Sequence, residues 1–241
     1  MASNALSTIA ILSGALIFGL KHALDADHLA AVSTIATQRK GLWSASMVGV
    51  LWGIGHTLTL LLAGVAVILL HFEIRPQLAL ALEFAVALML IALGTNALRR
   101  LAGGGRMHVH AHEHGAHTHI HPHLHGGAPE VDAHSHHASP LSSRPLLVGM
   151  VHGLAGSAAL MLMVLSTIPS PLLGFAYVAV FGVGSIGGML VMSLLVSLPA
   201  QLTVARFTRA HLAVRTLAGL FSLGLGLFMA YQIGVVDGLL V

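Results

Sequence analysis

The sequence predicts an all-α, polytopic membrane protein with about six transmembrane helices. Of its 241 residues, 56% are hydrophobic and only 8% are charged, whereas ordinary soluble domains carry roughly 25% charged residues. Several apolar runs exceed the roughly 20 residues that a helix needs to cross a bilayer core, and no segment predicts a sheet. Cysteine is absent, which excludes disulfides and thiolate sites and leaves nitrogen and oxygen atoms as metal ligands.

The first apolar run, residues 5–38, is interrupted by polar residues. A straight helix of that length would reach roughly 50 Å, more than a bilayer core, so we expect a break near residues 19–28. Broken helices with a polar centre recur in transporters. The sequence leaves open whether residues 5–20 cross the membrane separately. Five further spans are predicted at 43–70, 78–98, 145–168, 171–198 and 212–236.

Basic residues in the loops predict the orientation. With six spans, one side receives nine of them and the other receives only Arg75. The positive-inside rule assigns the basic side to the cytoplasm, so both termini would face outward. The N-terminus lacks the features of a removable signal peptide, and we expect the first run to be retained. The nine residues are Arg39, Lys40, Arg99, Arg100, Arg106, Arg144, Arg206, Arg209 and Arg215.

The stretch from His22 to His28 holds two imidazoles and two carboxylates within seven residues. Ionisable groups at membrane depth are costly and usually functional, and His and Asp together suit a divalent transition metal. On a regular helix, His22, Asp25 and His28 share an arc of about 120° and would form the ligand set, with Asp27 pointing elsewhere. An unwound segment would bring all four together. The alternatives are a polar network between helices and a proton relay.

Two more histidines lie inside predicted spans. His56 follows glycines that permit close helix approach, and each of His56 and His152 is either a metal ligand or a hydrogen-bonding residue between helices. His71 and His211 lie at span ends and are expected to be interfacial. The candidate metal ligands are therefore His22, Asp25, Asp27, His28, His56 and His152.

The two halves of the chain resemble each other. Residues 19–24 align with residues 149–154 at an offset of 130, and residues 52–55 align with residues 181–184 at an offset of 129. With three spans in each copy, the second copy would be inverted in the membrane, as in many secondary transporters. The predicted organisation is a first three-helix repeat with the metal motif at 1–102, a loop at 103–142 and a second three-helix repeat at 143–241.

Residues 103–142 form a histidine-rich segment with many glycines and prolines. Such a composition cannot bury enough surface to offset its ordering entropy, so we expect a cytoplasmic loop that is disordered without metal. Mostly neutral imidazoles could buffer, sense or receive metal, and the alternative is a solubilising linker. The metal-buffering candidates are His108, His110, His112, His114, His117, His119, His121, His123, His125, His134, His136 and His137.

Two motifs resemble those of the nickel/cobalt transporter family: His22-x4-Asp27-His28 and Gly55-His56-Thr57. The resemblance implies a bacterial inner-membrane permease that moves Ni²⁺, with Co²⁺ as a second cargo, without ATP hydrolysis. It also implies that the matched histidines and aspartate are needed for transport. The region that corresponds to a later acidic motif carries no acid, and about six spans replace eight. Both traits resemble the smaller, urease-associated nickel permease branch.

Three classes of function compete at this point. An inside-negative potential would drive uptake of a divalent ion, whereas an exporter would use the loop to gather cytosolic metal, and related exporters share such a loop. A membrane enzyme is disfavoured because only six of the 18 histidines lie outside the loop and no zinc-protease motif is present. We expect no catalytic cofactor and no nucleic acid, and as partners the metal ion, the lipid bilayer and a cytosolic nickel chaperone.

Overall fold

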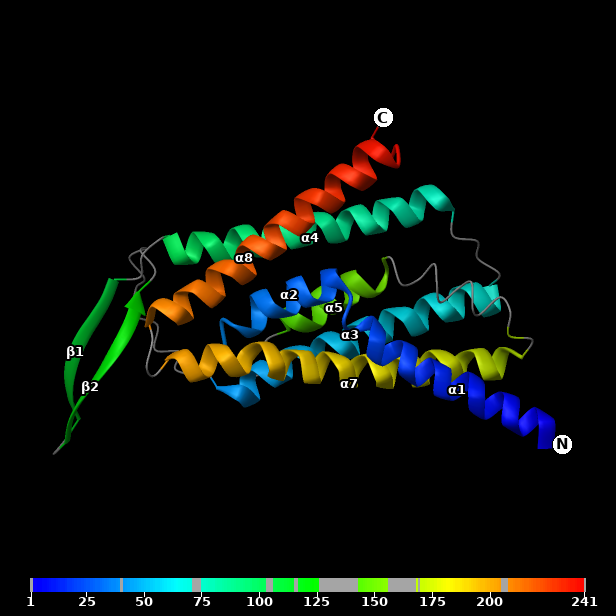
Figure 1. Cartoon of the computed structure of the whole chain (residues 1–241), viewed down its shortest axis with the longest axis horizontal. Coiled ribbons are helices and arrows are strands. Elements are labelled where there is room, and N and C mark those ends of the chain that lie inside the picture. The colour runs from blue at the N-terminus through cyan, green and yellow to red at the C-terminus, as the bar shows by residue number, and fades with distance from the viewer. Residues whose placement is uncertain are drawn as a thin grey trace.

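The computed structural model describes residues 2–39, 41–70, 75–102, 106–114, 117–125, 143–155, 168, 170–204 and 208–240. Its helices, shown in Figure 1, are α1 (Ala2–His22), α2 (Ala26–Ala36), α3 (Leu42–Leu70), α4 (Pro76–Ala102), α5 (Arg144–Gly153), α7 (Pro171–Val204) and α8 (Thr208–Tyr231). A short π-helical turn, η1 (Gln232–Val236), follows α8, and strands β1 (Arg106–His114) and β2 (His117–His125) lie between α4 and α5.

Four helices are long and apolar enough to cross a membrane: Leu42–Val67, Pro76–Ala102, Pro171–Pro199 and Ala210–Val236. The pair α1 and α2 passes the same test as one broken span, bent by 57°. The helices thus agree with a polytopic membrane protein, but the described residues hold up to five crossings rather than the six predicted. The difference lies at the predicted span 145–168. Only the 10 residues of α5 are described as helical there, and residues 156–167 lie outside the described residues.

The expected break in the first span falls between His22 and Ala26. Asp25 adopts an extended backbone conformation, with φ −61° and ψ 146°, at the start of α2. Its carboxylate makes no capping bond to that helix and binds the ring of His22 instead. The break therefore lies at the polar motif, where His28 is buried and the side chain of Asp25 is 51% exposed.

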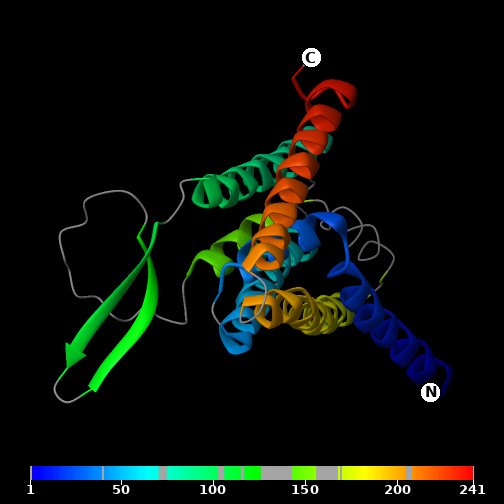
Figure 2. The ribbon, with the colours of Figure 1, turned by 60° about the vertical axis from the view of Figure 1, so that its left-hand side comes forward.

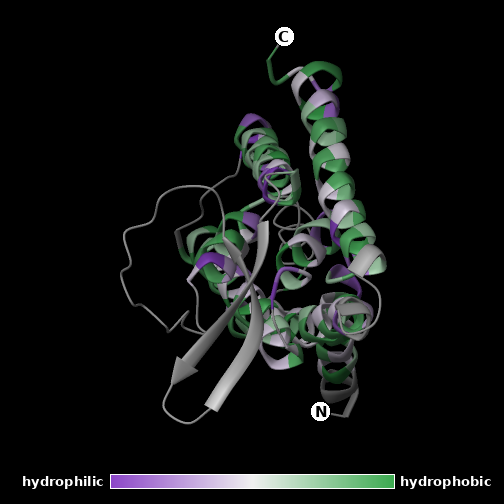
Figure 3. Cartoon of the chain, turned by 90° about the vertical axis from the view of Figure 1, so that its left-hand side faces the viewer, coloured by the Kyte–Doolittle hydropathy of each residue, from purple (hydrophilic) through white to green (hydrophobic). Residues whose placement is uncertain are grey.

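The helices consist mostly of hydrophobic residues, as the colouring of Figure 3 shows, and many large apolar side chains are exposed. Leu172, Ile17 and Phe228 expose 80%, 66% and 63% of their surface. In a water-soluble protein such a surface would promote aggregation, whereas in a bilayer it faces lipid tails. Small residues of α2, such as Ala30 and Ala31, are fully buried, together with large side chains such as Trp52 and Phe181.

The helices form two layers with α2 and α5 between them (Figure 1). One layer is the pair α4 and α8, the other is built on α3 and α7, and α1 packs against α7 while α5 packs against α3. The short helix α2 contacts α3, α4, α7 and α8. Without a hydrophobic force between helices in lipid, close packing and interhelical hydrogen bonds hold such a bundle. An example is the Thr34 hydroxyl, which is 3.1 Å from the Ala218 carbonyl oxygen of α8.

The contacts of the two halves correspond to each other. Four glycines pack so closely on a backbone carbonyl of the other half that an added Cβ would overlap it: Gly19 on Phe181, Gly149 on Trp52, Gly55 on Leu146 and Gly184 on Leu16. Under the sequence offsets of 129 and 130, the contact of Gly19 on Phe181 corresponds to that of Gly149 on Trp52. The contact of Gly55 on Leu146 corresponds in the same way to that of Gly184 on Leu16. In Figure 1 the residue colours run in opposite directions along α3 and α7, and along α4 and α8. This is the arrangement that an inverted repeat produces.

We expect Gly149→Ala to lower the melting temperature of the detergent-solubilised protein, because its methyl group would push α5 away from the Trp52 carbonyl. Overpacking of this kind typically costs about 1–3 kcal/mol. Gly14→Ala is the matched control, because a Cβ at Gly14 meets nothing within 4 Å and alanine favours the helix. Equal melting temperatures for the two variants would contradict the close packing of α5 on α3.

β1 and β2 form an antiparallel ribbon that stands apart from the helices (Figure 2). Histidine lies opposite histidine at four points of the register, from His108 opposite His123 to His114 opposite His117. The composition of this segment predicts a disordered loop and no sheet, so the ribbon differs from the expectation. The alternating histidines have the period of two that a strand requires, which accounts for the difference. His134, His136 and His137 lie outside the described residues.

Candidate metal site

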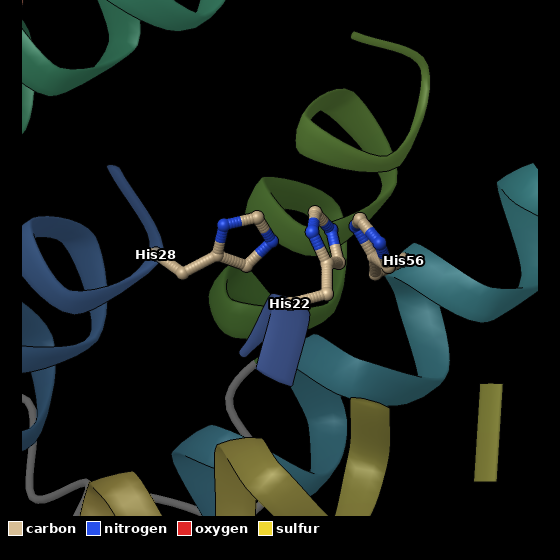
Figure 4. Close-up of side chains that lie close together, drawn as sticks. All are labelled: His22, His28 and His56. Atoms are coloured by element: carbon tan, nitrogen blue, oxygen red, sulfur yellow. The ribbon is translucent and has the colours of Figure 1, made fainter. Parts of the chain in front are cut away.

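Four histidines from four helices meet at the break in the first span. His22 ends α1, His28 lies in the first turn of α2, His56 lies in the middle of α3, and His152 lies near the end of α5. Figure 4 shows the first three with their rings turned toward one another. The ring centroid of His28 is 4.4 Å from that of His22, 5.3 Å from that of His56 and 4.0 Å from that of His152.

Three of these imidazoles offer nitrogen atoms to one point. One ring nitrogen from each of His22, His28 and His56 lies within 4.8 Å of the other two. Nε2 of His22, Nε2 of His28 and both nitrogens of His56 are buried and have no hydrogen-bond partner in the part of the chain that the structure describes. A buried polar atom without a partner costs roughly 1–3 kcal/mol. Each of the three rings, when neutral, has one nitrogen with a free lone pair that could bind a metal ion in the space they share.

The carboxylates hold two of these rings in the form that a metal requires. His22 Nδ1 lies 2.7 Å from an oxygen of Asp25, and His28 Nδ1 lies 3.0 Å from an oxygen of Asp27. An ionised carboxylate only accepts hydrogen bonds, so each Nδ1 carries the proton and each Nε2 keeps a free lone pair. The carboxylates therefore orient the ligands and add negative charge near the ion.

The positions of the two aspartates differ from the helical projection. A regular helix would place Asp25 beside His22 and His28 in the ligand set and turn Asp27 away. Because the chain breaks before Ala26, both carboxylates lie on the Nδ1 side of a histidine ring instead. The side chain of Asp25 is 51% exposed. This geometry is closer to the unwound alternative, in which all four residues of the motif converge.

Asp27 also joins the two halves of the chain. Its second oxygen lies 2.9 Å from Nε2 of His152, a residue of α5. Asp27, His28 and His152 form a second group of potential metal ligands with atoms within 4.8 Å of one another. The structure thus brings five of the six candidate ligands together in two groups that share His28. Asp25 lies outside both groups and contacts His22. Side chains of the twelve loop histidines lie outside the description.

Two aromatic residues that the motif analysis does not single out line this site. The ring of Phe181 lies 5.5 Å from His22, and the ring of Trp52 lies 5.6 Å from His152. Under the sequence offsets of 129 and 130, the pair of Phe181 and His22 corresponds to the pair of Trp52 and His152, and His56 corresponds to Ser185. The hydroxyl of Ser185 is buried and has no hydrogen-bond partner in the described residues. The repeat offsets were the signal that could have located them. Apolar ring faces exclude water and so strengthen metal binding by the imidazoles.

Comparisons with known proteins place the chain beside one curated relative. It is similar to the urease accessory protein UreH of Bacillus sp. (strain TB-90), with 38% identity over 232 residues that cover 96% of this chain and 95% of the relative. No family profile matches the chain, and no solved structure matches it. Because the aligned region covers nearly the whole of both chains, the likeness extends over both halves of this chain.

Proposed function

Because this chain belongs to the family of the urease accessory protein UreH, we propose that it carries Ni²⁺ across the bacterial cytoplasmic membrane as an ATP-independent permease. The observation that carries the proposal is the group of buried imidazole nitrogens at the break between α1 and α2, which have no hydrogen-bond partner among the described residues. The relative's name connects the family with urease, and the motifs resemble those of the nickel permease branch associated with urease. Co²⁺ is the second cargo that we propose.

Three imidazoles suit a cargo ion better than a permanent one. Neutral nitrogen ligands bind Ni²⁺ and Co²⁺ but leave the ion its double positive charge and open coordination positions. Transport requires binding that is favourable enough for the ion to arrive and weak enough for it to leave. A site of few ligands at the meeting point of two half-helices meets both needs, because a change in the 57° bend would move His22 relative to His28.

We propose uptake as the direction. The basic loops assign the ribbon to the cytoplasmic side, and an inside-negative potential of 100 mV gives a divalent ion about 4.6 kcal/mol of inward driving force. The loop histidines would then receive arriving ions and pass them to a cytosolic nickel chaperone. The same loop also suits an exporter that gathers cytosolic metal and returns protons in exchange, which is the second candidate.

Metal flux into liposomes tests the proposal. Liposomes containing the full chain and a metal-quenched dye would be given an inside-negative potential or, separately, a pH gradient. Influx of Ni²⁺ driven by the potential and abolished by His22→Ala supports the importer. A requirement for an opposing proton gradient supports the exporter. Absence of metal flux under both conditions contradicts transport altogether.

Removal of residues 106–138 is expected to leave the initial rate of Ni²⁺ influx unchanged, because no residue of the two ligand groups lies in that segment. The number of Ni²⁺ ions bound by the purified protein should fall, since all twelve histidines between positions 108 and 137 are lost. Equilibrium dialysis and the liposome assay measure the two quantities. A loss of influx as large as that caused by His22→Ala would instead make the loop part of the transport route.

A further inference from the structure

The two nitrogens of His28 face different groups of ligands. Nε2 has no partner among the described residues, and Figure 4 shows one ring nitrogen of His28 directed toward His22 while the other points away. Nδ1 lies 3.0 Å from Asp27, whose other oxygen lies 2.9 Å from His152. The imidazole of His28 therefore belongs to two groups: the three-histidine group of His22, His28 and His56, and the group of Asp27, His28 and His152.

The spacing of the second group fits a metal ion. Bonds of about 2.1 Å to nitrogen and oxygen place neighbouring ligands of an octahedral ion about 3.0 Å apart. One oxygen of Asp27 lies 3.0 Å from His28 Nδ1 and its other oxygen lies 2.9 Å from His152 Nε2, so each ring nitrogen lies at about that separation from a carboxylate oxygen. The protons of these two hydrogen bonds thus occupy a place that an ion could take. The carboxylate would also offset part of the charge of the ion.

Proton balance allows His28 to bind on one side at a time. A neutral imidazole has one free lone pair, so an ion on Nε2 requires the proton on Nδ1, and an ion on Nδ1 requires the proton on Nε2. His152 can likewise carry its proton on Nδ1 instead of Nε2, because its Nδ1 is buried and has no partner in the described part of the chain. Each ring keeps one proton and no charge, so the ion can change position without a net release of protons.

We propose that Ni²⁺ crosses the centre of the protein through two alternating positions joined by His28. The first position consists of His22, His28 and His56, all from the first repeat. The second consists of Asp27, His28 and His152, and therefore needs both repeats. This inference rests on the transport function proposed above and adds the route that the ion takes. Because the two positions share His28, they hold one ion between them.

Metal binding to the full chain tests the two positions without any transport assay. His56→Gln removes a ligand from the first position only, His152→Gln removes one from the second only, and the double variant damages both. His211→Gln, at the start of α8, is the matched control. All variants carry the loop, so its ions cancel in the difference between them. We expect the wild type, the control and each single variant to bind one more Ni²⁺ per chain than the double variant in equilibrium dialysis.

Two binding results would overturn the inference. If His56→Gln binds no more Ni²⁺ than the double variant, the second position does not exist. If the wild type binds two more ions than the double variant, the positions are independent rather than alternating. His56→Ala and His152→Ala repeat the comparison in case the glutamine amide itself binds the ion. Each variant must elute as a single species in gel filtration, and the Co²⁺ absorption spectrum of the single variants should differ, since one keeps a carboxylate ligand.

The liposome assay then separates the route from the function. We expect both single variants to lose Ni²⁺ influx at least about tenfold, because each interrupts one step. Influx retained by His152→Gln would overturn the second position as part of the route. Absence of influx in the wild type, with the binding pattern intact, would contradict transport and leave the two positions supported. Normal influx with a failed binding pattern would overturn only the alternating positions.

Discussion

His28→Ala is expected to reduce Ni²⁺ influx to the level of protein-free liposomes. His28 belongs to both ligand groups, is only 1% exposed and is oriented by Asp27. Loss of a residue that merely orients a ligand typically lowers metal affinity by about 10–100-fold, and loss of a ligand common to both groups should cost at least as much. Initial rates of dye quenching over a range of Ni²⁺ concentrations measure the effect.

Stabilisation by metal provides a second readout for the same variant. A ligand present at 100 times its dissociation constant stabilises the folded state by about 2.7 kcal/mol. Ni²⁺ should therefore raise the melting temperature of the wild type more than that of His28→Ala. His211→Ala, which alters a histidine at the start of α8, is the control and should behave as the wild type does. Unchanged influx in His28→Ala would remove the histidine cluster from the transport route.

The helical membrane architecture could be predicted from the sequence because its determinants are local. Long apolar runs, basic loops and prolines at helix ends indicate spans one at a time. The number of crossings could not be predicted in the same way. Residues 145–168 have the hydropathy of a span, but the described helix α5 ends at Gly153. The break between α1 and α2 was predictable because the run was too long for one straight crossing.

The members of the candidate site could be chosen from the sequence, but their arrangement could not. His22, Asp27 and His28 follow from the cost of ionisable groups in lipid. The projection of Asp25 into the ligand set assumed an unbroken helix, and the extended backbone at Asp25 removes that assumption. The bond between Asp27 and His152 joins residues 125 positions apart in the chain. The packing of α5 on α3 brings His152 close to Asp27, and no local sequence pattern predicts that packing.

The two halves share close backbone contacts but differ in charge at the site. Gly149 and Gly184 make backbone contacts that correspond to those of Gly19 and Gly55. The carboxylates occur only in the first half, where Asp25 and Asp27 have Ala155 and Ser157 as counterparts. The second half thus supplies His152 and Phe181, while the first supplies the carboxylates and Trp52.

Asp27→Asn is expected to lower the apparent affinity for Ni²⁺ and the rate of influx by about 10–100-fold. The carboxylate accepts a hydrogen bond from His28 Nδ1 with one oxygen and from His152 Nε2 with the other. An amide has one oxygen and an NH₂ group that only donates, so one of the two rings would face a donor with its N–H. That ring must move its proton to the opposite nitrogen. If the ring is His28, the proton then occupies the lone pair that the three-histidine group needs.

Asp25→Asn makes the same chemical change two residues away and serves as the matched control. In the part of the chain that the structure describes, the Asp25 carboxylate contacts only His22, and its side chain is 51% exposed against 27% for Asp27, so water can replace the lost acceptor. We expect the half-saturating Ni²⁺ concentration of Asp25→Asn to lie much closer to the wild-type value than that of Asp27→Asn does. Both variants would be compared with the wild type by concentration-dependent influx and by equilibrium dialysis. Equal losses in the two would mean that the negative charge of the motif matters for the ion, and that the bridge from Asp27 to His152 does not.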